Sequence, residues 1–95
     1  SITADASSQV SDVTSAITEI DATSATGAIS LADGTDGQIK IFINTSTSGT
    51  NNVVITPTNL RGYTTITLNA QGETAICLFK NSKWNVIGGH GFVAA

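Results

Sequence analysis

Short apolar runs, punctuated by glycine, asparagine and aspartate, fill the chain from residue 15 onward. The punctuation recurs every roughly eight to twelve residues, a spacing typical of all-β sandwiches and barrels. It predicts about seven short strands, near residues 16–21, 28–32, 38–44, 52–56, 64–69, 74–80 and 83–88. We therefore expect an all-β fold, a small antiparallel β-sandwich or barrel.

Residues 1–14 follow a different pattern, because Ile2, Val10 and Val13 are their only sizeable apolar side chains. Such a segment cannot bury enough surface to hold itself in place. We expect an extended N-terminal arm, either mobile or ordered against a partner, with at most one helical turn in SSQVSDV. A single β domain, residues 15–95, would follow it.

In the stretch GQIKIFIN, isoleucine alternates with other residue types, as expected for a strand with two different faces. Ile39, Ile41 and Ile43 fall on one face of the predicted strand, while Lys40, Phe42 and Asn44 fall on the other. The isoleucine side is the predicted core face, and the other side is mixed.

A hairpin is predicted at residues 74–88, because Asn81 and Ser82 separate two β-prone runs and Asn accepts the left-handed conformation of a two-residue turn. This register sets Phe79 opposite Trp84 and Cys77 opposite Val86 on a core face. The reverse face is apolar too, with Ile76, Leu78 and Ile87. A strand pair that is apolar on both sides is covered by another layer or by another subunit.

The amino-acid composition limits the kinds of partner that the chain is expected to bind. Charged residues make up 12% of the chain, and four basic against seven acidic residues give a net charge of −3. No cluster of Lys and Arg exists, so we expect no nucleic-acid partner and no membrane partner. The sequence contains no apolar run long enough for a spanning helix and no recognisable signal peptide.

A chain of 95 residues has a small core. One cysteine excludes an intrachain disulfide, and one Cys with one His cannot complete a zinc site. Association with copies of itself is therefore the expected source of additional stability.

The chain offers little catalytic chemistry. Cys77 is expected to be a buried strand residue, since the only histidine, His90, lies thirteen positions on. His90 stands among glycines with no following helix. The stretch that contains Asp33 and Asp36 is expected to be a turn rather than a catalytic carboxylate pair or a calcium-binding loop. We predict no enzymatic activity, no cofactor and no metal.

Residues 31–91 resemble a small β module that occurs in other proteins. The pieces LADGTDGQIK, VVITPTNLRGYTTITL, GETAICLF and KWNVIGG occur in the order and spacing of a small β module. That module recurs in structural proteins of marine and freshwater tailed phages and related large viruses. The chain resembles parts of both capsid decoration proteins and tail or fibre proteins.

The resemblance implies a virion component. We expect a capsid decoration (cement) protein on the capsid surface, a homotrimer that also contacts the major capsid protein and stabilises the shell through non-covalent contacts. The expected capsid or subunit contacts are apolar residues of the arm, the hairpin's second face and the tail: Ile2, Val10, Val13, Ile17, Ile76, Leu78, Ile87, Phe92 and Val93.

Two alternatives stay open. One is a receptor-binding or glycan-binding module of a tail fibre or tail tip, with Arg61 and Tyr63 facing the sugar. The other is a subunit of an extracellular filament in which the arm donates a strand to the next copy.

Overall fold

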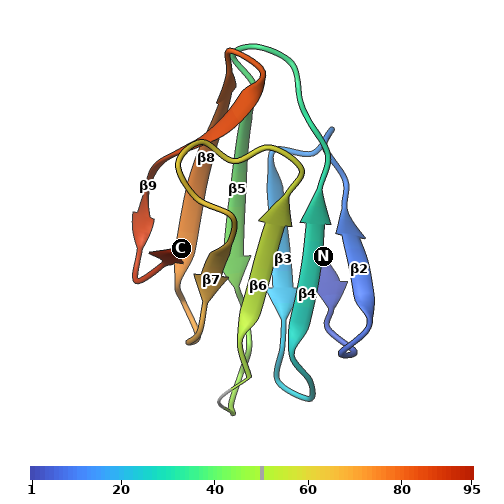
Figure 1. Ribbon diagram of the computed structural model, residues 1–95. Helices are drawn as coiled ribbons and strands as arrows, with labels where there is room; N and C mark the ends of the chain where they lie inside the picture. The colour runs from blue at the N-terminus through green and yellow to red at the C-terminus, as the bar shows by residue number, and fades with distance from the viewer. Residues whose placement is uncertain (50) are drawn as a thin grey trace.

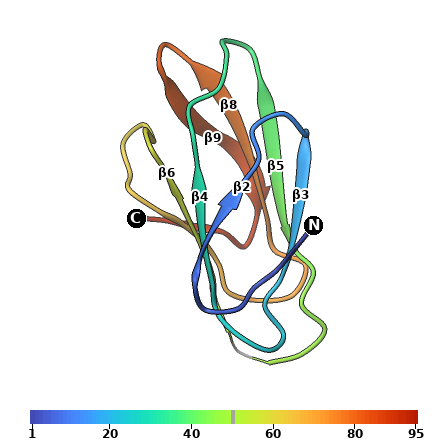
Figure 2. The same cartoon turned by 90° about the vertical axis from the view of Figure 1, so that its right-hand side faces the viewer.

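The computed structural model describes residues 1–49 and 51–95. Ten strands form two five-stranded sheets that pack face to face, and the described residues contain no helix (Figure 1). The predicted all-β sandwich is confirmed. Figure 2 shows the two layers edge on.

Each sheet takes strands from both halves of the chain. Sheet 1 has the order β1-β3-β5-β8-β9, with β1 (Ile2–Thr3), β3 (Ile17–Asp21), β5 (Ile39–Asn44), β8 (Thr74–Lys80) and β9 (Lys83–His90). Sheet 2 has the order β10-β7-β6-β4-β2, with β2 (Ser8–Ser11), β4 (Gly27–Leu31), β6 (Val53–Pro57), β7 (Ile66–Leu68) and β10 (Val93–Ala94).

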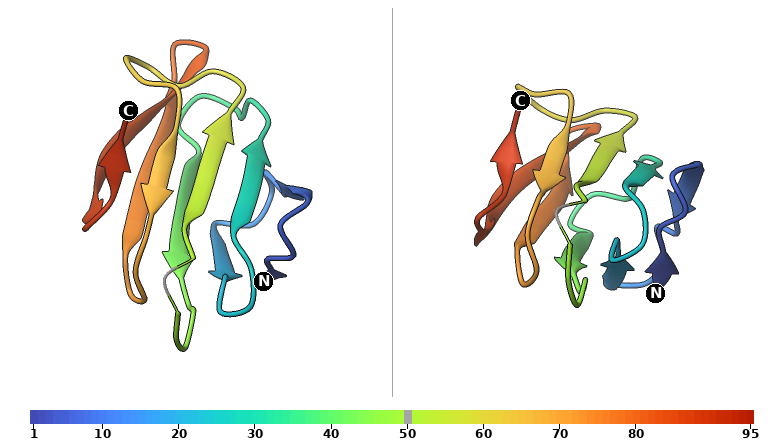
Figure 3. Two further views of the ribbon diagram at one scale, coloured as in Figure 1. Left: turned by 60° about the horizontal axis from the view of Figure 1, so that its bottom comes forward. Right: turned by 90° about the horizontal axis from the view of Figure 1, so that it is seen from below.

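The first six strands wind as a parallel coil. Each strand from β1 to β6 crosses to the opposite sheet, and strands two apart in the chain pair in parallel: β1 with β3, β3 with β5, β2 with β4, and β4 with β6. The view from below follows this winding (Figure 3). The prediction of an antiparallel sandwich is wrong for these pairs, because alternating side chains specify faces of a strand but not its direction.

The chain leaves sheet 1 in a similar way after each of the strands β1, β3 and β5. An Asp or Asn side chain accepts hydrogen bonds from the backbone N–H and the hydroxyl of the residue two positions on, at 2.5–3.0 Å. The pairs are Asp5 with Ser7, Asp21 with Thr23, and Asn44 with Ser46. These bonds also lower the pKa of Asp5 and Asp21. The repeated Asx-x-Ser/Thr sequence is the local signal of the coil.

The remaining strands are antiparallel. The predicted β8–β9 register is confirmed, with Phe79 opposite Trp84 and Cys77 opposite Val86. Asn81 and Ser82 both have positive φ, 53° and 65°, as a type I′ turn requires. A register shift between Ile76 and Cys77 then bends the pair toward its glycine-rich end.

Residues 1–14 are extended, but they bond to their own chain. β1 and β2 are the edge strands of the coil, and SSQVSDV contributes β2 instead of a helical turn. Ala4, between them, is only 3% exposed. The segment is too poor in apolar groups to fold alone, and the backbone groups of β3 and β4 supply the hydrogen bonds that order it.

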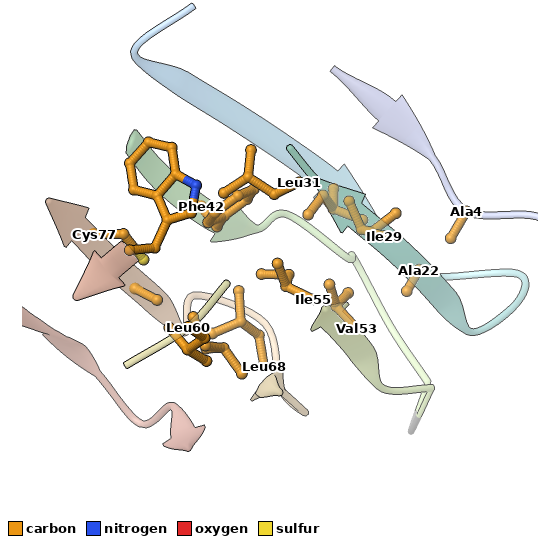
Figure 4. Packing of buried hydrophobic residues seen from close by; sticks show 14 of the residues in the cluster. Ala4, Ala22, Ile29, Leu31, Phe42, Val53, Ile55, Leu60, Leu68 and Cys77 are labelled. Atoms are coloured by element: carbon orange, nitrogen blue, oxygen red, sulfur yellow. The ribbon is translucent and has the colours of Figure 1, made fainter. Parts of the chain in front are cut away.

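The core fills the space between the sheets. Buried side chains from both layers point toward one another, among them Phe42, Leu31, Ile55 and Cys77 (Figure 4). Trp84 and Phe79 meet edge to face, with ring centroids 5.1 Å apart and an interplanar angle of 75°.

Strand β5 faces the opposite way from the prediction. Lys40, Phe42 and Asn44 point into the core, and Ile39, Ile41 and Ile43 point outward. The isoleucine side was predicted to be core because it is the more apolar. It lies outside because Phe42 fills the core and the two polar neighbours find hydrogen-bond partners there.

Candidate functional site

A fully buried lysine is the most unusual polar group in the core. Lys40 Nζ donates to the Ser15 carbonyl oxygen at 2.8 Å and to Asp12 Oδ1 at 3.3 Å. Hydrogen bonds from Ser15 hold the pKa of Asp12 well below its usual range, and the bond from Lys40 lowers it further by a smaller amount. An ionised Asp12 ties the β2–β3 connection to β5, so this cluster has a structural role.

Asn44 has a comparable structural role. Its Nδ2 donates to the Leu68 carbonyl oxygen at 3.1 Å, and its Oδ1 accepts from Ser46. Ser46 Oγ in turn accepts from the Ala22 N–H at 2.8 Å. The side chain thus links sheet 1 to β7 of sheet 2 without leaving a buried polar group unpaired.

Cys77 is buried, as expected. Burial raises the pKa of its thiol to about 11, so the nucleophilic thiolate is scarce at neutral pH. His90 is exposed at the end of β9, and its backbone N–H donates to Thr74 Oγ1 at 3.1 Å. Cys77 pairs with Val86 instead, so the register does not bring the two residues together.

The two loop aspartates are engaged with neighbouring turns. Both carboxylate oxygens of Asp33 accept from Asn59 Nδ2, at 3.0 and 2.9 Å. Asp36 accepts from the Asn81 N–H at 3.2 Å and lies 3.6 Å from Lys80 Nζ. Across the described residues, no group of three His, Cys, Asp or Glu side chains is placed to hold a metal ion, and no pocket is found.

Arg61 and Tyr63 do not act as a free pair. Arg61 Nε donates to Asn85 Oδ1 at 2.7 Å, and its guanidinium also reaches the carbonyl oxygens of Lys80 and Asn81. Tyr63 is 53% exposed. The arginine holds the β8–β9 turn in place, whereas the tyrosine side chain stands apart from these contacts.

The outer face of sheet 1 is the most apolar exposed surface. Seven aliphatic side chains share it and are called the isoleucine face below: Ile17, Ile39, Ile41, Ile43, Ile76, Leu78 and Ile87. They are neighbours across strands, because Ile41 pairs with both Ile17 and Ile76, and Ile39 pairs with Leu78. Ile17, Ile39 and Ile87 are 53%, 39% and 55% exposed, and the other four are half-buried. A contiguous apolar patch of this kind is a candidate interaction site.

The nine predicted contact residues do not form one surface. Four of them, Ile17, Ile76, Leu78 and Ile87, lie on the isoleucine face. Ile2, Val13 and Phe92 are half-buried against the core. Val10 and Val93 are 72% and 52% exposed on β2 and β10, the two opposite edges of sheet 2.

The three isoleucines of β5 were missed as surface residues. The alternation in GQIKIFIN did place them on a common face, but it could not say which face meets the second sheet. Their nearness to Ile76 and Leu78 depends on the β5–β8 pairing, which joins segments more than 30 residues apart.

No protein-family model, curated protein or solved structure matches this chain. Among the described residues, none belongs to a helix long and apolar enough to cross a membrane. The fold and the site together define an all-β sandwich with a parallel coil, whose most distinctive surface is an apolar sheet face.

Proposed function

We propose that this chain is a virion structural protein without enzymatic activity, which decorates the outside of a viral capsid and stabilises it. The observation that carries the proposal is the isoleucine face. A small, sparsely charged β body that leaves seven aliphatic side chains on one outer face is suited to act through surface contact.

Two further observations support a contact role over a chemical one. The thiol of Cys77 is buried and protonated, and the loop carboxylates are engaged by Asn59, Asn81 and Lys80. In addition, residues 31–91 resemble a module of tailed-phage virion proteins.

The partners in this proposal are copies of the chain and a major capsid protein. Contacts across neighbouring capsid subunits add binding free energy to the assembled shell alone, and this raises the cost of separating those subunits. The exposed Val10 and Val93 on sheet 2 are candidates for shell contact, because they lie away from the isoleucine face.

The test is a reconstruction of the virus particle that carries this chain, together with rebinding of the purified protein to shells that lack it. We expect regular density on the capsid surface and a higher temperature of genome release after rebinding. Density confined to the tail, or rebinding that leaves genome release unchanged, would contradict the capsid role.

A tail-fibre component is the second candidate. The observation that favours it is the parallel coil from β1 to β6, since its first turn presents β1 and β2 as open sheet edges. Open edges pair readily with further strands, as in elongated fibres. The same particle reconstruction distinguishes this candidate by its position.

A further inference from the structure

The isoleucine face has opposite charges at opposite corners. Glu19 and Asp21 point outward from β3, at the end of the sheet where Ile43 pairs with both Glu19 and Thr74. Lys80 and Lys83 face each other across the β8–β9 pair at the other end, beyond Leu78. The apolar side chains lie between the acidic corner and the basic corner.

The charges at these corners differ in how they are already used. Lys80 is 3.6 Å from Asp36, and Asp21 Oδ1 accepts from Thr23. Arg61 adds positive charge beside the basic corner through its contact with Asn85. Within the part of the chain that the structure describes, Glu19 and Lys83 form no ion pair.

We propose that two copies of this chain pair face to face through their isoleucine faces, related by a two-fold axis that lies in the interface. That axis exchanges the two corners, so Glu19 of each copy meets Lys83 of the other while the aliphatic centres stack. The inference goes beyond the capsid role and does not depend on it.

Self-complementarity identifies a second copy as the occupant. A two-fold interface uses the same patch twice, and therefore needs a patch that matches its own rotated image. An apolar centre flanked by acid on one diagonal corner and base on the other meets this requirement. Two β-sheets packed face to face also stand about 10 Å apart, a normal arrangement for aliphatic side chains.

A two-fold pair is a dimer, whereas the sequence led us to expect a trimer. Sedimentation equilibrium of the whole chain distinguishes the two by mass. We expect a reversible monomer–dimer equilibrium in the wild-type protein, with no larger species.

Ile41→Glu places a charge at the centre of the face, next to Ile17 and Ile76. We expect it to be monomeric at concentrations where the wild type is dimeric. Thr56→Glu is the matched control, because Thr56 is exposed on β6 at the outer face of sheet 2. This control should dimerise like the wild type, and circular dichroism checks that both variants are folded.

Charge reversal tests the symmetry. Glu19→Lys or Lys83→Glu alone should raise the dimer dissociation constant by about tenfold, because like charges then meet across the interface. The double variant in one chain should restore dimerisation. A mixture of the two single variants should form heterodimers, since every contact between them again joins opposite charges.

Four results would overturn the proposal. The first is a wild-type protein that stays monomeric near 1 mM, a concentration of the order at which very weak pairing becomes visible. The second is a wild-type trimer, and the third is a dimer that survives Ile41→Glu. The fourth is a failure of the two single charge variants to complement each other. Binding of the face to isolated capsid protein by a wild type that stays monomeric would assign the face to the shell instead.

Discussion

At the residue scale, Trp84 makes several contacts that join the two sheets. Its ring is fully buried, packs edge-on against Phe79 and donates from Nε1 to the Ala32 carbonyl oxygen at 2.9 Å. Its backbone N–H also donates to the Asn59 carbonyl oxygen at 2.9 Å. The side chain therefore anchors the β8–β9 hairpin to the loops that follow β4 and β6.

Replacing Trp84 with Ala should lower the free energy of unfolding by about 3–5 kcal/mol, because it removes a large buried side chain and leaves a cavity. Urea denaturation followed by circular dichroism measures the change. Tyr63→Ala is the control, since Tyr63 is 53% exposed and its loss should cost about 0.5 kcal/mol or less. Equal stability of Trp84→Ala and the wild type would show that the ring does not support the core.

Cys77 predicts how stability varies with alkaline pH. Burial raises the pKa of its thiol from 9.0 to about 11 in the folded chain. Between these values the unfolded chain gives up the proton while the folded chain keeps it, so stability falls as pH rises.

From pH 8 to pH 10.5 this thiol should remove about 2 kcal/mol of stability. Denaturation of wild type and Cys77→Ala across that range isolates the effect, because the two proteins differ only at residue 77. The wild-type curve should fall more steeply than that of the variant. Parallel curves would mean that the thiol is not held protonated in the folded chain.

At the scale of elements, the β8–β9 pair shows a contrast between two adjacent glycines. Gly89 has φ +139°, and a Cβ there would meet the Thr74 carbonyl oxygen and lie 2.9 Å from Ala75 Cα. At Gly88, by contrast, the nearest atom is Ile76 Cδ1 at 3.9 Å, an ordinary contact. The backbone of β8 thus requires glycine only at residue 89.

Gly89→Ala should destabilise the chain by about 2 kcal/mol or more, since both the backbone conformation and the close approach are unfavourable for a side chain. Gly88→Ala, its neighbour, should change stability by less than about 1 kcal/mol. Thermal unfolding of the two variants gives the comparison. Similar costs at the two positions would contradict the bend described for this pair.

Elements differed in how well the sequence predicted them. The β8–β9 hairpin was predicted with its register because its signal is local, a two-residue turn between alternating runs. The parallel pairs of the coil have a local signal only in the Asx-x-Ser/Thr sequence, which marks where a strand of sheet 1 ends and does not specify the strand's partner. They join residues 18 to 26 positions apart, such as Ile2 with Ile20 and Gly27 with Val53, and their connections carry no turn that fixes strand direction.

On the scale of the whole molecule, the first turn of the coil is part of the folded body. Ala4 is buried, Ile2 and Val13 pack against the core, and Asp12 helps to hold the buried ammonium of Lys40. Removing these residues would uncover the edges of β3 and β4, which pair with β1 and β2.

Deletion of residues 1–14 should therefore lower the free energy of unfolding by at least about 2 kcal/mol, through lost packing and newly exposed core. Adding Lys40→Met to the deletion should regain part of this loss, because the buried ammonium has then lost a partner. Chemical denaturation of both chains measures the difference. A deleted chain as stable as the wild type would show that residues 1–14 are only an appended arm.

The sequence by itself determined the all-β class, the approximate positions of the seven strands β3 to β9 and the turn of the β8–β9 hairpin, since these depend on local alternation and turn residues. Tertiary structure alone decided which strands run parallel and how residues 1–14 are held. It also decided that Lys40 and Asn44 lie inside while three isoleucines lie outside. Alternation defines two faces for every strand, and only the packing of one sheet against the other selects which face is core.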